Sequence, residues 1–216
     1  FSLQTNSKSN YFNTTLSIAS LLYMNYLAVV KKKQQPQAED FNIATLVMRD
    51  AKAVEFLQRI GYDIINYSIF DLKGNPASFD PFLLPISTKL ISGRVLTARM
   101  FKHLGWHIYT RFPFFAHIAL KGYVKNNEGS FRKTIEISSA PKKRPTFIYA
   151  HFMLPHSPFF FDKNGKRKPD GLVFEELEAE SPKPYLEYVQ YANTKIVELI
   201  NTIQKNDPSA VIVLMG

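Results

Sequence analysis

The chain has 216 residues, 45% of them hydrophobic and 14% aromatic, which excludes a disordered chain and allows one α/β domain or two small ones. Its 27 Lys and Arg residues against 18 Asp and Glu residues give a net charge of +9, which suits an anionic partner. Because Cys is absent, catalysis by a thiolate and metal sites built on thiolates are excluded.

The first predicted element is a helix over residues 14 to 30, an apolar run behind the polar head Asn13, Thr14 and Thr15. It is at the lower limit of length for a membrane span and carries several Thr, Ser and Asn residues, so a buried core helix is favoured over a membrane helix. Residues 31 to 40 are predicted as a polar loop. A helix over residues 49 to 60, ended by Gly61, and a strand over residues 62 to 69 follow.

The second half alternates helix and strand. Residues 80 to 125 are expected to be mainly helical, residues 145 to 151 form a strand, and residues 162 to 171 form a loop. Apolar residues at helical spacing predict a helix over residues 184 to 204. The run "SAVIVLM" predicts a final strand buried in a parallel sheet. This order favours an α/β layered fold, and because the chain ends within a strand pattern we expect a piece of a longer protein.

Thr14 is the first candidate for chemistry. If Asn13 or Thr14 caps the helix, the hydroxyl lies among unpaired backbone N–H groups at the positive end of the helix dipole, where an anionic ester can bind. Ser17 is expected on the same face one turn later. The alternative is a plain N-cap with Ser17 packed against a neighbour.

Histidines give the second set of candidates. His151 lies near the end of a predicted strand and His156 in the Pro-flanked loop beyond it, where ligands of open α/β sheets gather. An imidazole there can bind an anionic oxygen, protonate a leaving group or hold a metal, or it can simply satisfy a structural hydrogen bond. His103 and His107 have the spacing of a metal clamp, but helix packing is the favoured interpretation.

Two segments resemble a known family, the sulfatase-like proteins of the alkaline phosphatase superfamily. "SNYFNTTLSIASLLYMNYL" is similar to their nucleophile segment, in which a Thr-x-x-Ser core is embedded. The matching positions are Ser9, Asn10, Tyr11, Thr14, Ser17, Ala19, Ser20, Met24, Tyr26 and Leu27. "FIYAHFMLPHSPFFFDKNG" is similar to the family segment that contains two His residues, here His151 and His156. The resemblance covers the chain from end to end and is nearest to membrane-anchored phosphoethanolamine and phosphoglycerol transferases.

The resemblance implies a three-layer α/β/α sandwich, alkaline phosphatase-like, truncated at both ends, with residues 1 to 216 as one partial catalytic domain. It implies Thr14 as nucleophile and metal ligand and His156 as a contact to the substrate's anionic group. It also implies that His151, Ser17 and Asn10 help to bind substrate. A divalent metal (zinc, manganese, magnesium or calcium) is expected in the longer protein, where an Asp-His pair would follow Gly216. With the other ligands outside the chain, this fragment is expected to hold no metal and to be inactive.

The function implied is a metal-dependent hydrolase or transferase of phosphate or sulfate esters, with a covalent Thr intermediate. An arylsulfatase is the first alternative, disfavoured because a Thr cannot mature to the aldehyde of sulfatases. An alternative of another class is a non-catalytic extracytoplasmic binding or sensing module. The expected partners are an anionic ester substrate, a lipid headgroup or a phospho- or sulfo-sugar, and a membrane reached through an upstream segment, with the domain on the periplasmic side. The scattered basic clusters are typical of solvated surface, so no nucleic-acid partner is predicted.

Overall fold

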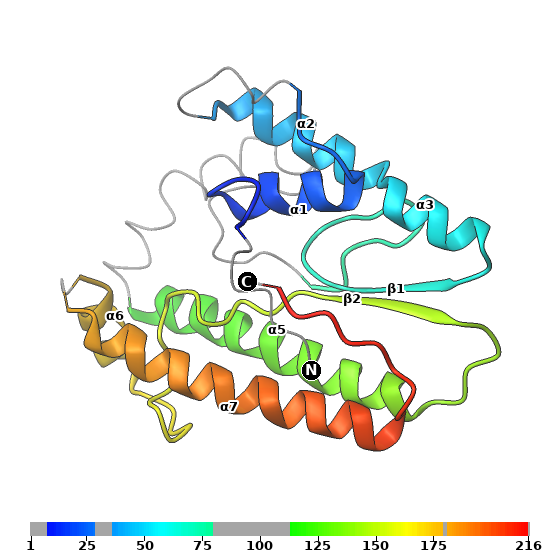
Figure 1. Ribbon diagram of the computed structural model, residues 1–216. Coiled ribbons are helices and arrows are strands. Elements are labelled where there is room, and N and C mark those ends of the chain that lie inside the picture. The colour runs from blue at the N-terminus through cyan, green and yellow to red at the C-terminus, as the bar shows by residue number, and fades with distance from the viewer. Residues whose placement is uncertain (1–7, 29–35, 80–112, 179–180, 216) are drawn as a thin grey trace.

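The computed structural model describes residues 8–28, 36–79, 113–178 and 181–215, and within these the chain is a mixed α/β structure (Figure 1). Its sheet has two parallel strands, β1 (Asp63–Tyr67) and β2 (Thr146–Ala150). The register runs from Asp63 opposite Thr146 to Tyr67 opposite Ala150, so both strands end at the same edge.

Three helices precede β1: α1 (Thr14–Tyr23), α2 (Ala38–Arg49) and α3 (Lys52–Arg59). They lie on one side of the sheet in Figure 1. Asn13 caps α1, because its side-chain oxygen accepts a hydrogen bond from the Thr15 N–H at 3.0 Å. At α2, the Gln37 N–H donates to the Asp40 carboxylate at 2.7 Å. Gly61, with φ +93°, turns the chain after α3 into β1 in a conformation that L side chains rarely adopt.

The remaining helices are α5 (Pro113–Ser139), α6 (Asp170–Glu178) and α7 (Lys183–Asn206). They lie on the opposite side of the sheet from α1, α2 and α3 (Figure 1). α5 contacts both strands and packs along α7. Among the described residues, no helix is long and apolar enough to cross a membrane.

The apolar core falls into two clusters. The larger one joins α1, α2 and the segment after β1, through residues such as Leu16, Met48 and Phe70, and reaches Tyr149 of β2. The second joins α5, the segment after β2, α6 and α7, and includes Tyr123, Phe160, Val173 and Tyr188. The sheet therefore separates two cores that are built from different parts of the chain.

Several sequence predictions are confirmed. The helix over residues 49 to 60 corresponds to α3, and the strands over 62 to 69 and 145 to 151 correspond to β1 and β2. The helix over 184 to 204 corresponds to α7, with Ala192 and Leu199 buried. The apolar run of the first helix is a core helix, since Leu16 and Ala19 are fully buried. Of the helical region over 80 to 125, residues 80–112 lie outside the described part and residues 113–125 belong to α5.

The final strand is the clearest error. Residues 211–215 form neither a strand nor a helix, and Val211 and Val213 have exposed fractions of 91% and 73%. An apolar run signals a need for burial but not the neighbouring strand that would supply it. Within the described chain the sheet consists of β1 and β2 only, so the segment after α7 remains uncovered.

Three boundaries also differ from prediction. α1 ends at Tyr23 and not at residue 30, because Met24 takes a left-handed conformation (φ 59°) and its N–H bonds back to the Leu21 carbonyl. The polar loop predicted over 31 to 40 already gives way to α2 at Ala38, a helix that the sequence pattern did not predict. The predicted loop over 162 to 171 ends two residues earlier, because α6 begins at Asp170.

Candidate functional site

The candidate site lies at the edge where β1 and β2 both end. The Tyr67 carbonyl at this edge accepts a hydrogen bond from the His151 N–H at 3.1 Å, which continues the parallel pairing by one step. In parallel α/β sheets the carboxyl ends of strands are where ligands bind. Figure 1 shows the N-terminal end of α1 on this same side of the molecule.

A buried polar turn follows β1. The Asn66 side-chain amide donates to the carbonyls of Phe70 at 2.7 Å and Asn75 at 2.9 Å, and its oxygen accepts from the Ser68 hydroxyl at 2.6 Å. The Ser78 hydroxyl donates to the Asn66 carbonyl at 2.6 Å. Because Asn66 and Ser68 are buried, these bonds replace water for backbone groups that would otherwise be unpaired.

α5 holds the segments that leave both strands. The Ser130 hydroxyl donates to the Tyr67 carbonyl at 3.1 Å. The Asn127 side-chain oxygen accepts from the Met153 N–H at 2.8 Å, and the Tyr123 hydroxyl donates to the Met153 carbonyl at 3.2 Å. Burial raises the pKa of Tyr123, so this hydroxyl stays protonated and remains a donor. The three residues share one face of α5, which fixes the loop that carries the histidines.

His151 is a neutral ring packed into the edge of the sheet. Its ring stands edge-on to Phe70, with centroids 5.3 Å apart. Burial, and secondarily the charge of His156, lower the pKa of His151 to about 4. At neutral pH the imidazole is therefore uncharged, and it cannot serve as a cationic contact for an anionic ester.

His156, in contrast, is exposed. Its Nδ1 lies 2.5 Å from the Ser157 carbonyl oxygen, so the proton is assigned to Nδ1, which donates to that carbonyl. Nε2 is then the nitrogen that faces solvent. It can accept a proton or, once protonated, donate a hydrogen bond to an anionic oxygen.

Thr14 is the first residue of α1 and its side chain is exposed. The capping bond is made by Asn13, so the Thr14 hydroxyl is not consumed by the cap, and no described residue forms a hydrogen bond with it. It stands beside backbone N–H groups of the first turn, at the positive end of the helix dipole. Its neighbour Thr15 is buried, which makes Thr14 the hydroxyl that a substrate can reach.

The side chains of Ser17 and Asn10 form hydrogen bonds within the protein. The Ser17 hydroxyl donates to the Tyr11 carbonyl at 2.6 Å, accepts from the Tyr11 N–H at 3.2 Å and contacts the Ser9 hydroxyl. The Asn10 amide donates to the Ser20 hydroxyl at 3.0 Å. These bonds fold the segment before α1 back onto the helix. Their observed contribution is to hold the chain that leads to Thr14, and a contact with substrate stays a prediction.

A metal centre is not assembled by the described residues, among which no three His, Asp or Glu side chains come together. Thr14 alone supplies one oxygen, whereas zinc, magnesium and calcium sites take four or more ligands. His103 and His107, the alternative metal clamp, lie outside the described residues. The residues in hand therefore do not by themselves fit a divalent metal.

Sequence reasoning missed the polar residues that build the edge. Asn66 and Ser68 lie in "NYS" at a strand end, and a single Asn in a β-branched run gave no reason to expect a buried hydrogen-bond hub. The buried polar face of α5 had a readable signal, since Tyr123, Asn127, Ser130 and Thr134 recur at helical spacing. The helical region predicted over residues 80 to 125 ends before three of these four positions, so this face was not predicted.

Comparisons of the chain with protein-family models, with curated proteins and with solved structures found no match. The resemblance to sulfatase-like proteins therefore rests on the sequence motifs quoted above. The chemistry of the candidate site is inferred from the positions and contacts of its own residues.

Proposed function

We propose that the chain is part of an enzyme that hydrolyses or transfers phosphate or sulfate esters, with Thr14 as nucleophile and His156 as a contact to the anionic group. The supporting observation is the exposed, unengaged Thr14 hydroxyl at the N-terminus of α1. A phosphate placed there meets backbone N–H groups and the helix dipole. The N-terminal end of α1 and the carboxyl ends of β1 and β2 share one side of the molecule (Figure 1).

In the proposed reaction the Thr14 oxygen attacks the phosphorus or sulfur in line with the leaving alcohol. A bond forms to the Thr14 oxygen while the bond to the leaving oxygen breaks, and the electron pair goes to that oxygen. The proton of the Thr14 hydroxyl passes through solvent to the leaving oxygen, which departs as an alcohol. The negative charge on the transferred group is met by the first-turn N–H groups and by Nε2 of His156. Water or a second alcohol then takes the group from Thr14 and restores the hydroxyl.

A divalent metal, when bound, would lower the pKa of a coordinated hydroxyl and so help it to lose its proton. The described residues do not assemble such a site. The proposal includes the finer fold assignment, a three-layer α/β/α sandwich of the alkaline phosphatase type. It also includes metal ligands outside the described residues and an extracytoplasmic location at the membrane.

The test is Thr14→Ala in the protein, assayed for release and transfer of phosphate and sulfate from ester substrates. Removing a nucleophile should lower the rate by about a thousandfold or more. The stability should change by no more than about 0.5 kcal/mol, because the side chain is exposed and makes no described hydrogen bond. Thr194→Ala, a matched change at an exposed position of α7, should leave the rate unchanged.

Three outcomes separate the proposal from its alternatives. Rates that survive Thr14→Ala would exclude Thr14 as nucleophile. Transfer of sulfate but not phosphate would favour a sulfatase. If the wild-type protein binds the ester at the same affinity as the Thr14→Ala variant and neither turns it over, the non-catalytic binding module is supported.

A further inference from the structure

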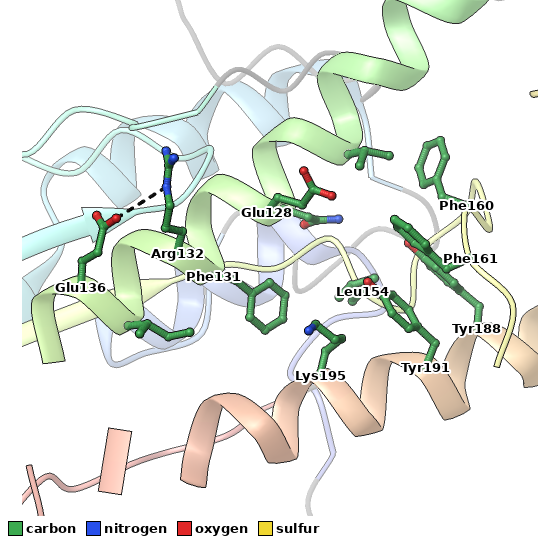
Figure 2. Close-up of a pocket in the computed structure, with 13 residues that line it drawn as sticks. Glu128, Phe131, Arg132, Glu136, Leu154, Phe160, Phe161, Tyr188, Tyr191 and Lys195 are labelled. Atoms are coloured by element: carbon green, nitrogen blue, oxygen red, sulfur yellow. Dashed lines mark ion pairs between the residues drawn. The ribbon is translucent and has the colours of Figure 1, made fainter. Parts of the chain in front are cut away.

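A separate cavity lies between α5 and α7, beneath the loop that follows β2 (Figure 2). Its volume is about 320 Å³, at the lower end of the range for small-molecule sites. The walls are mainly aromatic and apolar: Phe131, Leu154, Phe160, Phe161, Tyr188 and Tyr191. None of the residues that carry the proposed ester chemistry lines it.

The aromatic walls are held in place by stacking. Phe161 and Tyr191 stack with centroids 4.7 Å apart, and Tyr188 and Tyr191 stack at 5.8 Å. Phe160 and Tyr188 are fully buried, so the back of the cavity is fixed by the second core cluster. Figure 2 shows Tyr188 and Tyr191 reaching from α7 and Phe131 from α5, so a bound molecule would be enclosed by rings from different elements.

Charged side chains surround the cavity. Arg132 pairs with Glu136 at 3.7 Å, and Lys195 pairs at 2.6 Å with Glu198, which lies outside the lining. Glu128, which lines the cavity and is exposed, forms no ion pair with any described residue. Burial, and after it the charges of Glu128 and Glu198, raise the pKa of Tyr191, one of the lining rings. The lining itself holds two carboxylates and two cations, and with both cations paired the carboxylate left without an ion pair is that of Glu128.

We propose that this cavity binds a small organic ammonium ion that carries apolar substituents. Aromatic faces attract an alkylated cation through their quadrupoles, and the Glu128 carboxylate supplies the opposite charge. An inorganic cation is disfavoured because the walls offer few oxygen ligands, and an anion is disfavoured by the unpaired carboxylate. The inference does not depend on the proposed ester chemistry.

The experiment titrates the chain with phenyltrimethylammonium and with tert-butylbenzene, a neutral molecule of nearly the same shape, and follows the tyrosine ring signals by NMR. The cation should bind about tenfold more tightly than the neutral compound, as expected for a partly desolvated cation between aromatic rings. Equal binding of the two compounds, or no binding of the cation at millimolar concentration, would overturn the proposal.

Variants locate the site. Glu128→Gln should lower the affinity for the cation several-fold and leave the affinity for the neutral compound unchanged. Glu175→Gln, a matched change at an exposed position on α6, should change neither affinity. Tyr191→Leu should remove the preference for the cation, and Tyr191→Phe, which keeps the ring, should retain it. If Tyr191→Leu does not fold, the other two variants still test the site. Glu128→Gln should lose the preference for the cation, and Tyr191→Phe should keep it. Equal losses in Glu128→Gln and Glu175→Gln would mean that only the overall charge acts.

Discussion

His151 shows how one side chain links the site to the stability of the fold. Its pKa lies near 6.5 in the unfolded chain and is lowered to about 4 in the folded protein by burial, with a smaller contribution from His156. Between these two values the unfolded chain binds more protons than the folded one. Stability should therefore be fully present above pH 6.5 and fall as the pH drops toward 4.

The loss at the acid end should be roughly 3 kcal/mol, the free-energy equivalent of a shift of that size. Urea denaturation at a series of pH values measures it, with His151→Gln as the variant that removes the titrating group. Between pH 6.5 and 4 the free energy of unfolding of the variant should fall by less than that of the wild type, and the difference should equal this amount. His156→Gln, at an exposed ring, serves as the control and should keep most of the slope. Parallel curves for wild type and His151→Gln would contradict the burial of this ring.

At the residue scale the sequence predicted candidate residues from their local setting and missed the structural hydrogen-bonding residues, and a chemical role of the candidates stays a prediction. Thr14 and His156 were singled out by their setting at a helix start and in a Pro-flanked loop, and both are exposed. Asn66 was not predicted, because its importance comes from carbonyl groups of Phe70 and Asn75 that only the folded turn brings near it. A hydrogen-bond hub of this kind depends on tertiary geometry, and no local pattern encodes it.

At the scale of elements, α1 depends on its first turn. The Asn13 oxygen accepts the Thr15 N–H at 3.0 Å, and the Ser17 N–H donates to the Asn13 carbonyl at 2.9 Å. Asn13→Ala should cost about 1 kcal/mol of stability, whereas Asn13→Asp should keep the cap and add a favourable charge at the positive end of the dipole. Thermal unfolding monitored by circular dichroism measures both.

Asn164→Ala provides the control, because Asn164 is exposed in a surface turn and its side chain makes no hydrogen bond with a described residue. It should change stability by less than about 0.5 kcal/mol. A loss in Asn13→Asp as large as that in Asn13→Ala would show that the side-chain oxygen is not the capping group. The Thr14 setting proposed for catalysis would then need a different explanation.

Element boundaries were predictable where a residue marks them. Gly61 ends α3 as expected, because the chain there needs a positive φ. The end of α1 carries no Gly or Pro, and Met24 takes the left-handed conformation without a sequence signal. The start of α2 depends on the bond between the Gln37 N–H and Asp40, which is a local signal but was obscured by the polar composition around it.

At the scale of the whole molecule, the alternation of helices and strands predicted the mixed α/β class because it follows from local patterns. It did not predict how many strands would pair, since pairing depends on which segments meet in space. The cavity between α5 and α7 could not be predicted from the sequence either, because its walls combine residues of two helices and a loop. The last apolar segment shows the same limit. The apolar composition of residues 211–215 predicts a buried strand, but Val211 and Val213 are exposed.

That exposure can be tested by placing charge on the segment. Changing both Val211 and Val213 to Lys should reduce stability by less than about 1 kcal/mol, because little apolar area is removed from burial. The same change should reduce self-association, since a row of exposed apolar residues favours contact between molecules. Urea denaturation and sedimentation velocity measure the two effects.

Val173→Lys is the matched positive control, because this valine has no exposed area in the second core cluster. It should cost several kcal/mol or prevent folding, since burying an unpaired charge is among the most destabilising single changes. If the double Lys variant loses as much stability as Val173→Lys, residues 211–215 are buried in solution, and the strand predicted from the sequence exists after all. If its stability is retained, the apolar pattern of this segment is not matched by burial, and β1 and β2 stay the only paired strands among the described residues.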